Sequence, residues 1–223
     1  IENELASQFN TRKQLVLKTI YAYISHSGNL YDTDCLSMFG SNSFNLVWED
    51  VCADIMNNQL EKPIGILRLP EPLKLEYETD IRLKDLIEKP LWTITGEKAN
   101  DTLIPDLISI KDDQFIIFDA KYYNAQLEPG RTPKCQPGIE AITKQYLYQL
   151  AYQDFIKKHG FSVVRNCFLM PTEKHEIIDK GEVSMKMFSH LALQNIKVRF
   201  IPASMAYDHY LSGKKMDFEI LKF

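Results

Sequence analysis

The stretch LIPDLISIKDDQFIIFDAK, residues 103–121, has the pattern of a β-hairpin. Two runs rich in β-branched and aromatic residues, 103–110 and 115–121, are separated by a short polar break. Asp112 and Asp113 lie in the middle of that break and are suited to a two-residue turn. The stretch therefore predicts two adjacent antiparallel strands.

Two carboxylates face each other across this predicted hairpin. With the turn at Asp112 and Asp113, opposed residues have numbers that add up to 225, as those of Asp106 and Asp119 do. The Cβ atoms of such a pair lie about 5 Å apart. Because side chains alternate along a strand, Lys121 falls on the same face as Asp119.

This arrangement points to metal chemistry. Adjacent carboxylates among apolar neighbours repel each other unless something neutralises them, and Mg²⁺ or Mn²⁺ does so with oxygen ligands. Asp106, Asp119 and the Ala120 carbonyl are the expected ligands, while Lys121 is expected to contact a phosphate and assist the attacking water. An ordinary polar hairpin face remains the alternative, since a slipped register or a bulge would separate the carboxylates.

The rest of the chain predicts an α/β core with a mixed sheet flanked by helices. Residues 1–42 are expected to form an N-terminal helical extension, with a helix over 1–26, and residues 43–223 the domain that carries the hairpin. Helices are predicted at 43–58, 139–158 and 203–211, and further strands at 91–95, 163–170 and 196–201. A loop rich in glycine and proline spans 124–138.

Composition limits the function further. The net charge of −4 argues against a protein that coats nucleic acid without specificity, but it permits local basic sites and metal ions. The four cysteines are dispersed and form no CxxC pair, which disfavours a zinc site and fits a reducing cytoplasm. Apolar runs are too short to cross a bilayer. We therefore expect a cytoplasmic protein without membrane contact.

Pro105-Asp106, twelve further residues and then Asp119-Ala120-Lys121 resemble the pattern of the PD-(D/E)xK nuclease superfamily. The segment WEDVC, residues 48–52, is similar to the acidic first core helix of these nucleases, and the resemblance implies that Glu49 is a further metal ligand, directly or through water. A solvated helix glutamate is the alternative.

The segment QYLYQLAY, residues 145–152, resembles the glutamine–tyrosine helix motif of McrC-type restriction subunits. Gln145, Gln149 and Tyr152 share one flank of the predicted helix. We expect Gln149 to hydrogen-bond the active-site water or a DNA phosphate, with a polar helix edge as the alternative. Taken together, these features are most similar to the LlaJI-type restriction endonucleases over about residues 40–212.

This resemblance implies a Mg²⁺-dependent endonuclease that cuts double-stranded DNA with an McrB-like AAA+ GTPase subunit, as a homodimer or higher assembly. The chain contains no P-loop motif, so the nucleotide would be hydrolysed by the partner. Because the chain begins at Ile1 rather than Met, we expect it to be the catalytic fragment of a longer protein. Arg131, Lys134 and Lys144 are candidate contacts to DNA phosphates.

Two other functions fit the same residues. One is a repair or recombination exonuclease of the same superfamily. The other is an adaptor that has the nuclease fold and binds DNA without cutting it, although such a protein would have no need of Asp106, Asp119 and Lys121 together.

Overall fold

A computed structural model describes residues 43–71 and 79–223 of the chain. These residues belong to one compact unit, Ser43–Phe223. The helix predicted over residues 1–26 and the turn-rich segment after it lie outside the described residues. The division of the chain into a helical extension and a second domain therefore stays a prediction.

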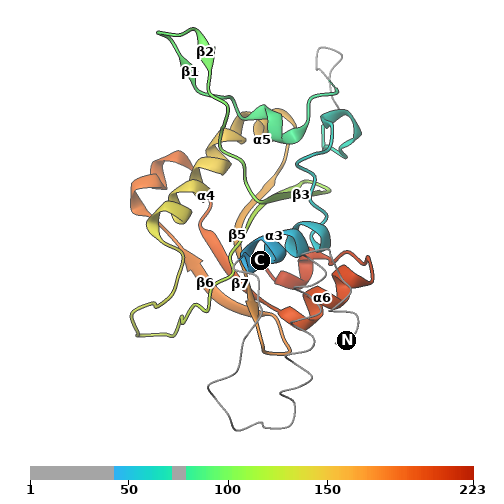
Figure 1. Cartoon of the computed structure of the whole chain (residues 1–223), viewed down its shortest axis with the longest axis vertical. Coiled ribbons are helices and arrows are strands. Elements are labelled where there is room, and N and C mark those ends of the chain that lie inside the picture. Colours follow the sequence, from blue (N-terminus) through green and yellow to red (C-terminus); the bar gives the residue numbers. More distant parts are fainter. Residues whose placement is uncertain (1–42, 72–78) are drawn as a thin grey trace, which may run out of the picture. The chain divides into compact units, whose positions relative to one another are not determined.

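The core is a five-stranded mixed sheet with the strand order β3-β4-β5-β7-β6 (Figure 1). The inner pairs β4–β5 and β5–β7 are parallel, and the outer pairs β3–β4 and β6–β7 are antiparallel. The strands are β3 (Leu107–Lys111), β4 (Gln114–Ala120), β5 (Val163–Thr172), β6 (Ile178–Val183) and β7 (Ile196–Pro202).

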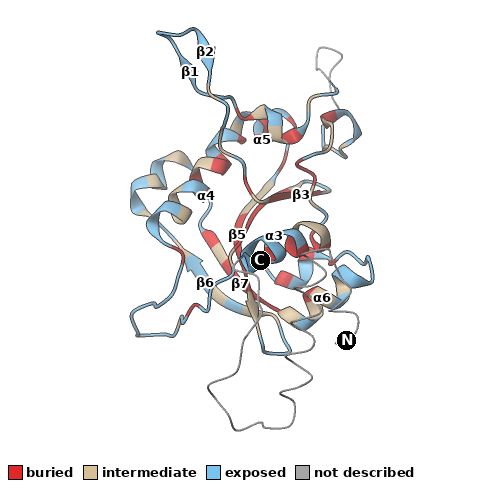
Figure 2. Ribbon diagram, viewed as in Figure 1, coloured by how far each residue is buried: buried red, intermediate tan, exposed pale blue. Residues whose placement is uncertain are grey.

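Helices cover both faces of this sheet. One face packs against α3 (Phe44–Ile55) and α6 (Ala203–Leu211), and the other against α4 (Ile139–Ala151) and α5 (Gln153–Lys158). Because β4 is covered on both sides, it is a nearly continuous apolar run whose alternate residues enter opposite cores, as Ile116 and Ile117 do. Figure 2 shows the buried residues concentrated along the central strands. Among the described helices, none combines the length and hydropathy needed to span a membrane.

Helix α3 is held on the sheet by its apolar stripe and by one buried hydrogen bond. Trp48, Val51, Cys52 and Ile55 are buried on the face that meets β4. The indole Nε1 of Trp48 donates to the Leu169 carbonyl at 3.1 Å. Since Trp48 is fully buried, this bond fixes the rotation of α3 and with it the direction of the next residue along the helix.

The outer edge of β3 is covered by the segment that follows α3. The Gln59 amide donates to the Ile108 carbonyl at 2.8 Å, and Ile108 N donates to Asn58 Oδ1 at 3.1 Å. The Gln59 side chain adds a third bond to the Ile110 carbonyl at 3.1 Å. These contacts satisfy backbone groups that an edge strand would otherwise leave open.

Several predicted elements have different boundaries in the structure. The first predicted strand shortens to β1 (Leu91–Trp92), which pairs with β2 (Glu97–Lys98) in a separate two-stranded hairpin. β3 begins four residues later than expected, because Pro105 has no backbone N–H for the ladder. The long helix over 139–158 divides into α4 and α5 at Tyr152.

Strand β6 was missed by the sequence analysis. Its sequence IDKGEV is largely charged and contains Gly181, whose φ is +81°. β6 is an edge strand with an irregularity in its pairing between Asp179 and Glu182. Such a strand needs little apolar surface, so hydrophobic alternation does not reveal it. Short 3₁₀ helices occur at Ile64–Ile66, Leu83–Leu86, Lys186–Leu191 and Phe218–Leu221.

Candidate active site

The hairpin has the register that the sequence predicts. Leu107 pairs with Phe118 and Lys111 with Gln114, so opposed residues add up to 225 along the whole of β3. Asp112 occupies the turn with a φ of +54°. Backbone pairing between the two strands ends at Leu107. At the preceding residue, the Asp106 side chain takes over, because its Oδ2 accepts from the Ala120 backbone amide at 2.8 Å.

The structure brings Asp106, Asp119 and Lys121 together. Lys121 Nζ lies 2.8 Å from Asp119 Oδ2 and 3.9 Å from Asp106 Oδ2. Burial lowers the pKa of Lys121, but the carboxylates of Asp119, Asp106 and Glu49 together outweigh this effect, so the lysine pKa is raised. Lys121 is therefore a fixed positive charge beside two carboxylates. Its backbone N–H donates to Leu169 at 2.9 Å, which extends the parallel pairing beyond the end of β4.

Asp119 is the most deeply buried member of this group, at 4% exposure. Burial, followed by the charge of Asp106, raises its pKa from 3.8 to about 7 despite the opposing effect of Lys121. Its Oδ2 is shielded from water and is paired with the Lys121 ammonium at 2.8 Å. A carboxylate oxygen has more than one lone pair, so this oxygen can also bind a cation that takes the place of the lysine.

We expect Asp119 to make the metal-free protein less stable as the pH rises. The folded state binds the Asp119 proton more tightly than the unfolded chain, because the pKa is about 7 rather than 3.8. The resulting stabilisation is complete below the unfolded pKa and is lost as the pH rises through the folded pKa. In urea titrations with EDTA, the free energy of unfolding should fall more steeply across this window in the wild type than in Asp119→Asn. Parallel profiles for the two proteins would contradict the assignment.

Glu49 lies on α3 at the margin of this group. Burial and the negative charge of Asp106 raise its pKa, while a hydrogen bond from Asn45 and the charge of Lys121 oppose the rise. In residues 43–71 and 79–223, no three acidic, histidine or cysteine side chains gather closely enough to form a metal site by themselves. Glu49 is thus an outer member of the group, which favours contact with a metal through water over direct ligation.

The structure does not bring Gln149 into this group. Its Oε1 accepts from Asn166 Nδ2 at 2.7 Å and from the Gln194 backbone amide at 2.9 Å. These bonds join α4 to β5 and to the segment before β7. No hydrogen bond within residues 43–71 and 79–223 connects Gln149 with Asp106, Asp119 or Lys121, and its contact with water or DNA stays a prediction.

Two other residues of α4 lie nearer to the carboxylates along β4. Gln145 is fully buried, donates to the Ile117 carbonyl at 2.9 Å and has an unpartnered Oε1. The pKa of the buried Tyr148 is raised by burial and then by the charges of Asp119 and Asp106, which places the phenol within their electrostatic reach. The sequence predicted correctly that Gln145 and Gln149 share one helix flank. It named Gln149, four residues further on, as the residue that hydrogen-bonds the active-site water or a DNA phosphate.

The predicted DNA-contacting cations are all outside the core. Arg131 pairs with Glu128 and Lys144 with Glu140, each at 2.7 Å on the surface. The Lys134 backbone pairs with Gln126 and its side chain is exposed. Their exposure is compatible with phosphate contact, which stays a prediction for all three.

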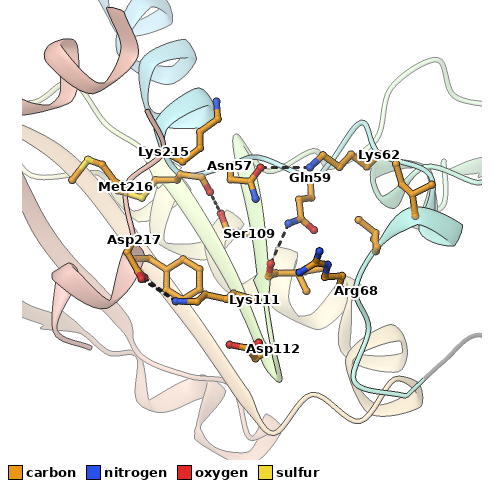
Figure 3. A pocket seen from close by; sticks show the side chains of 15 residues that line it. Asn57, Gln59, Lys62, Arg68, Ser109, Lys111, Asp112, Lys215, Met216 and Asp217 are labelled. Atoms are coloured by element: carbon orange, nitrogen blue, oxygen red, sulfur yellow. Dashed lines mark hydrogen bonds and ion pairs between the residues drawn. The ribbon is translucent and has the colours of Figure 1, made fainter. Parts of the chain in front are cut away.

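A cleft of about 500 Å³ lies at the other end of β3, beside the hairpin turn (Figure 3). Four cationic side chains line it, but two of them form ion pairs, Lys111 with Asp217 and Lys215 with Asp54. None of the candidate catalytic residues lines this cleft. The carboxylates thus occupy the opposite end of the hairpin.

The residues present fit a small divalent cation. Asp119 offers a buried oxygen whose partner is the Lys121 ammonium, and Asp106 uses Oδ2 for the Ala120 amide. The second carboxylate oxygen of Asp106 is a candidate metal ligand, because hard carboxylate oxygens suit Mg²⁺ or Mn²⁺. Two protein carboxylates, with the other positions left to water and substrate phosphate, are a common arrangement for Mg²⁺.

Comparison with known proteins agrees with the resemblance. The profile of the LlaJI restriction endonuclease family matches residues 1–204. The type II restriction enzyme BsuMI component YdjA of Bacillus subtilis (strain 168) is 28% identical over 219 residues. That alignment covers 96% of this chain but 42% of the relative, so the chain spans less than half of that protein. No solved structure matches. Since the family profile covers nearly the whole chain, the chain belongs to the LlaJI restriction endonuclease family.

Proposed function

We propose that this chain is the catalytic part of a Mg²⁺-dependent restriction endonuclease that hydrolyses phosphodiester bonds in double-stranded DNA. The observation that carries the proposal is the cluster of Asp106, buried Asp119 and Lys121 at one end of the β3–β4 hairpin. A hairpin with a purely structural role gains nothing from two adjacent carboxylates, one of which is costly to bury.

Asp106 and Asp119 would hold the metal, with Glu49 contributing through water and the Ala120 carbonyl as a further candidate ligand. A bound Mg²⁺ supplies a water of lowered pKa and balances negative charge on the phosphate. Lys121 is the group of the chain that can contact the same phosphate oxygen or the attacking water. Its positive charge is favoured by the neighbouring carboxylates, so it can act as an electrostatic stabiliser once a metal takes its place at Asp119 Oδ2.

We also propose that the β3–β4 hairpin and the parallel strands β4 and β5, with α4 in the connection between them, form a PD-(D/E)xK core. Residues 43–223 would then be the nuclease domain. The support is the order of the elements. An acidic helix, α3, precedes the hairpin, and a long helix, α4, follows it and leads into the parallel strand β5.

The proposed partner is an McrB-like AAA+ GTPase subunit. Its identity as a GTPase rests on the resemblance to McrC-type and LlaJI-type subunits, and two observations are compatible with a separate partner subunit. The Bacillus subtilis relative is named as a component of its restriction enzyme, and this chain has no P-loop motif of its own. Addition of such a subunit with GTP should increase the cleavage rate, while GTP without it should have no effect.

Closed circular DNA distinguishes an endonuclease from the alternatives. With protein in excess, we expect Mg²⁺ to support conversion of supercoiled circles to nicked and linear forms, and EDTA to prevent it. An exonuclease would degrade linear DNA and leave the circles intact. A protein that binds both DNA forms in Mg²⁺ but cuts neither, with or without the GTPase subunit, would be an adaptor and would contradict the proposal.

A further inference from the structure

A row of aromatic rings leads from the core to the surface beside Lys121. The ring of Trp48 lies 6.4 Å from that of Tyr207, and Tyr207 lies 6.5 Å from Phe44. Phe44 in turn lies 5.0 Å from Tyr122, at an interplanar angle of 54°. Two of these residues come from α3, one from α6 and one directly follows Lys121. The outer pair, Phe44 and Tyr122, is called the aromatic platform below.

Exposure increases along this row. Trp48 is fully buried and Tyr207 half-buried, whereas Phe44 is 38% exposed and Tyr122 is 47% exposed. The inner rings hold the platform in place, because Trp48 is also bonded to the Leu169 carbonyl. The platform is therefore an aromatic surface, packed against α3 and α6, that presents two partly exposed rings to solvent.

The platform and the candidate active site are built from the same two elements. β4 places Asp119 on one face, and Tyr122, which follows Lys121 directly, turns its ring to the other face, towards α3, so the platform lies beside the site rather than within it. α3 contributes Phe44 to the platform and Glu49, little more than one turn later, to the margin of the site. Nucleotides of one DNA strand follow each other at about 3.4 Å along the helix axis. A nucleotide next to a phosphate bound at Lys121 is thus within reach of the platform.

The chemistry of the platform suits a nucleobase better than a phosphate. Phe44 and Tyr122 carry no charge, and the nearby α3 residues Glu49 and Asp50 are acidic and would repel a phosphate. Aromatic rings stack on bases of any sequence, with a contribution of about 1–3 kcal/mol for each base. In a regular duplex both faces of an internal base are covered by its neighbours, so only an unstacked base can use such a surface.

We propose that the platform of Phe44 and Tyr122 stacks on an unpaired nucleobase adjacent to the phosphodiester bond that is cut. This inference rests on the proposed function, because the Asp106–Asp119–Lys121 group is what brings the nucleotide to the platform. The platform then acts as a positioning surface that stabilises a locally distorted DNA step at the site.

The test compares two single-stranded oligonucleotides of equal length, one of thymidine and one made only of abasic deoxyribose phosphate. Both are titrated by fluorescence anisotropy in Ca²⁺, which takes oxygen ligands and is used here to hold phosphate without cleavage. The wild type should bind the thymidine oligonucleotide more tightly by about 5- to 100-fold, which is the effect of one stacked base. Tyr122→Leu should lose this preference and Tyr122→Phe should keep it.

Trp92→Leu is the matched control, because Trp92 is also an exposed aromatic residue (63%) but belongs to the separate β1–β2 hairpin. It should keep the full preference, and thermal melting should show that every variant is folded. Equal binding of both oligonucleotides by the wild type, or an unchanged preference in Tyr122→Leu, would overturn the platform and leave the nuclease proposal standing. Failure of the wild type to bind either oligonucleotide in Ca²⁺ would overturn the phosphate-binding site and the platform with it.

Discussion

Replacing Asp119 with asparagine should abolish Mg²⁺-dependent cleavage, with a loss of at least about 10³-fold in rate. The substitution removes the negative charge of the buried carboxylate, whose Oδ2 is shielded from water and is a candidate cation ligand. It keeps the shape of the side chain, so the β4 packing and the hairpin register should be retained. Cleavage of supercoiled DNA under single-turnover conditions measures the loss, and calorimetry with Mn²⁺ should show weakened metal binding.

The same substitution should not destabilise the metal-free protein. Burial and Asp106 disfavour the charged form of Asp119, and asparagine is neutral at every pH. At about pH 8, where wild-type Asp119 is mostly ionised, the free energy of unfolding of Asp119→Asn should equal or exceed that of the wild type. A variant that lost activity only because it unfolded would contradict this explanation.

Asp112→Asn is the matched control for this variant. Asp112 belongs to the same hairpin but lies in the exposed turn, at a positive φ that asparagine accepts readily. It should retain cleavage and metal binding. If Asp119→Asn cut DNA as fast as Asp112→Asn, Asp119 would not be a catalytic ligand.

Replacing Lys121 with methionine should lower the cleavage rate by about 10²- to 10³-fold while metal binding is maintained or strengthened. Lys121 Nζ lies 2.8 Å from the oxygen of Asp119 that a cation would use, so the lysine and the metal compete for it. The measurements are single-turnover cleavage and Mn²⁺ calorimetry, both at about pH 8.5 so that Asp119 is ionised in each protein. A parallel loss of cleavage and of metal affinity would show that Lys121 only maintains the site.

Lys197→Met is the control for removal of a lysine. Lys197 forms an ion pair of 2.6 Å with Glu182 at the far edge of the sheet, where β6 pairs with β7. Its replacement should alter neither cleavage nor metal binding. A comparable loss in this variant would show that the effect of Lys121→Met is a general consequence of lost positive charge.

The hairpin could be predicted from sequence because its determinants are local. The two-residue turn defines the register as far as the Leu107–Phe118 pair, and Asp106 and Asp119 come directly after that pair. Helix α3 was recognised from its apolar spacing in the same way, and α6 has the predicted boundaries Ala203–Leu211. Each of these predictions depends on neighbours within one or two elements along the chain.

Features that depend on distant segments were predicted less well. The role of Gln149 is decided by Asn166 and Gln194, which lie 17 and 45 residues away in sequence. Helical spacing places Gln145 and Gln149 on one flank but does not show that Gln145 meets β4 while Gln149 meets β5. The edge strand β6 was missed because it has no apolar pattern of its own. It is a strand because it pairs with β7, which lies elsewhere in the sequence.

The aromatic platform also needed the structure. Phe44 and Tyr122 are 78 residues apart in the sequence, and only the packing of α3 beside the end of β4 brings their rings to 5.0 Å. Tyr122 is 47% exposed and Tyr123 is 42% exposed, which the sequence pattern does not show. Exposure next to Lys121 is what turns these aromatic residues into a candidate surface for DNA.

Asp106 and Asp119 together should bind a divalent metal ion, and a crystal structure of the protein in Mn²⁺ with anomalous diffraction data tests this directly. We expect an anomalous peak bound by one oxygen of each carboxylate at about 2.1 Å, with Lys121 Nζ displaced from Asp119 Oδ2. Absence of the peak at a Mn²⁺ concentration that supports cleavage, with the Lys121–Asp119 ion pair intact, would contradict it.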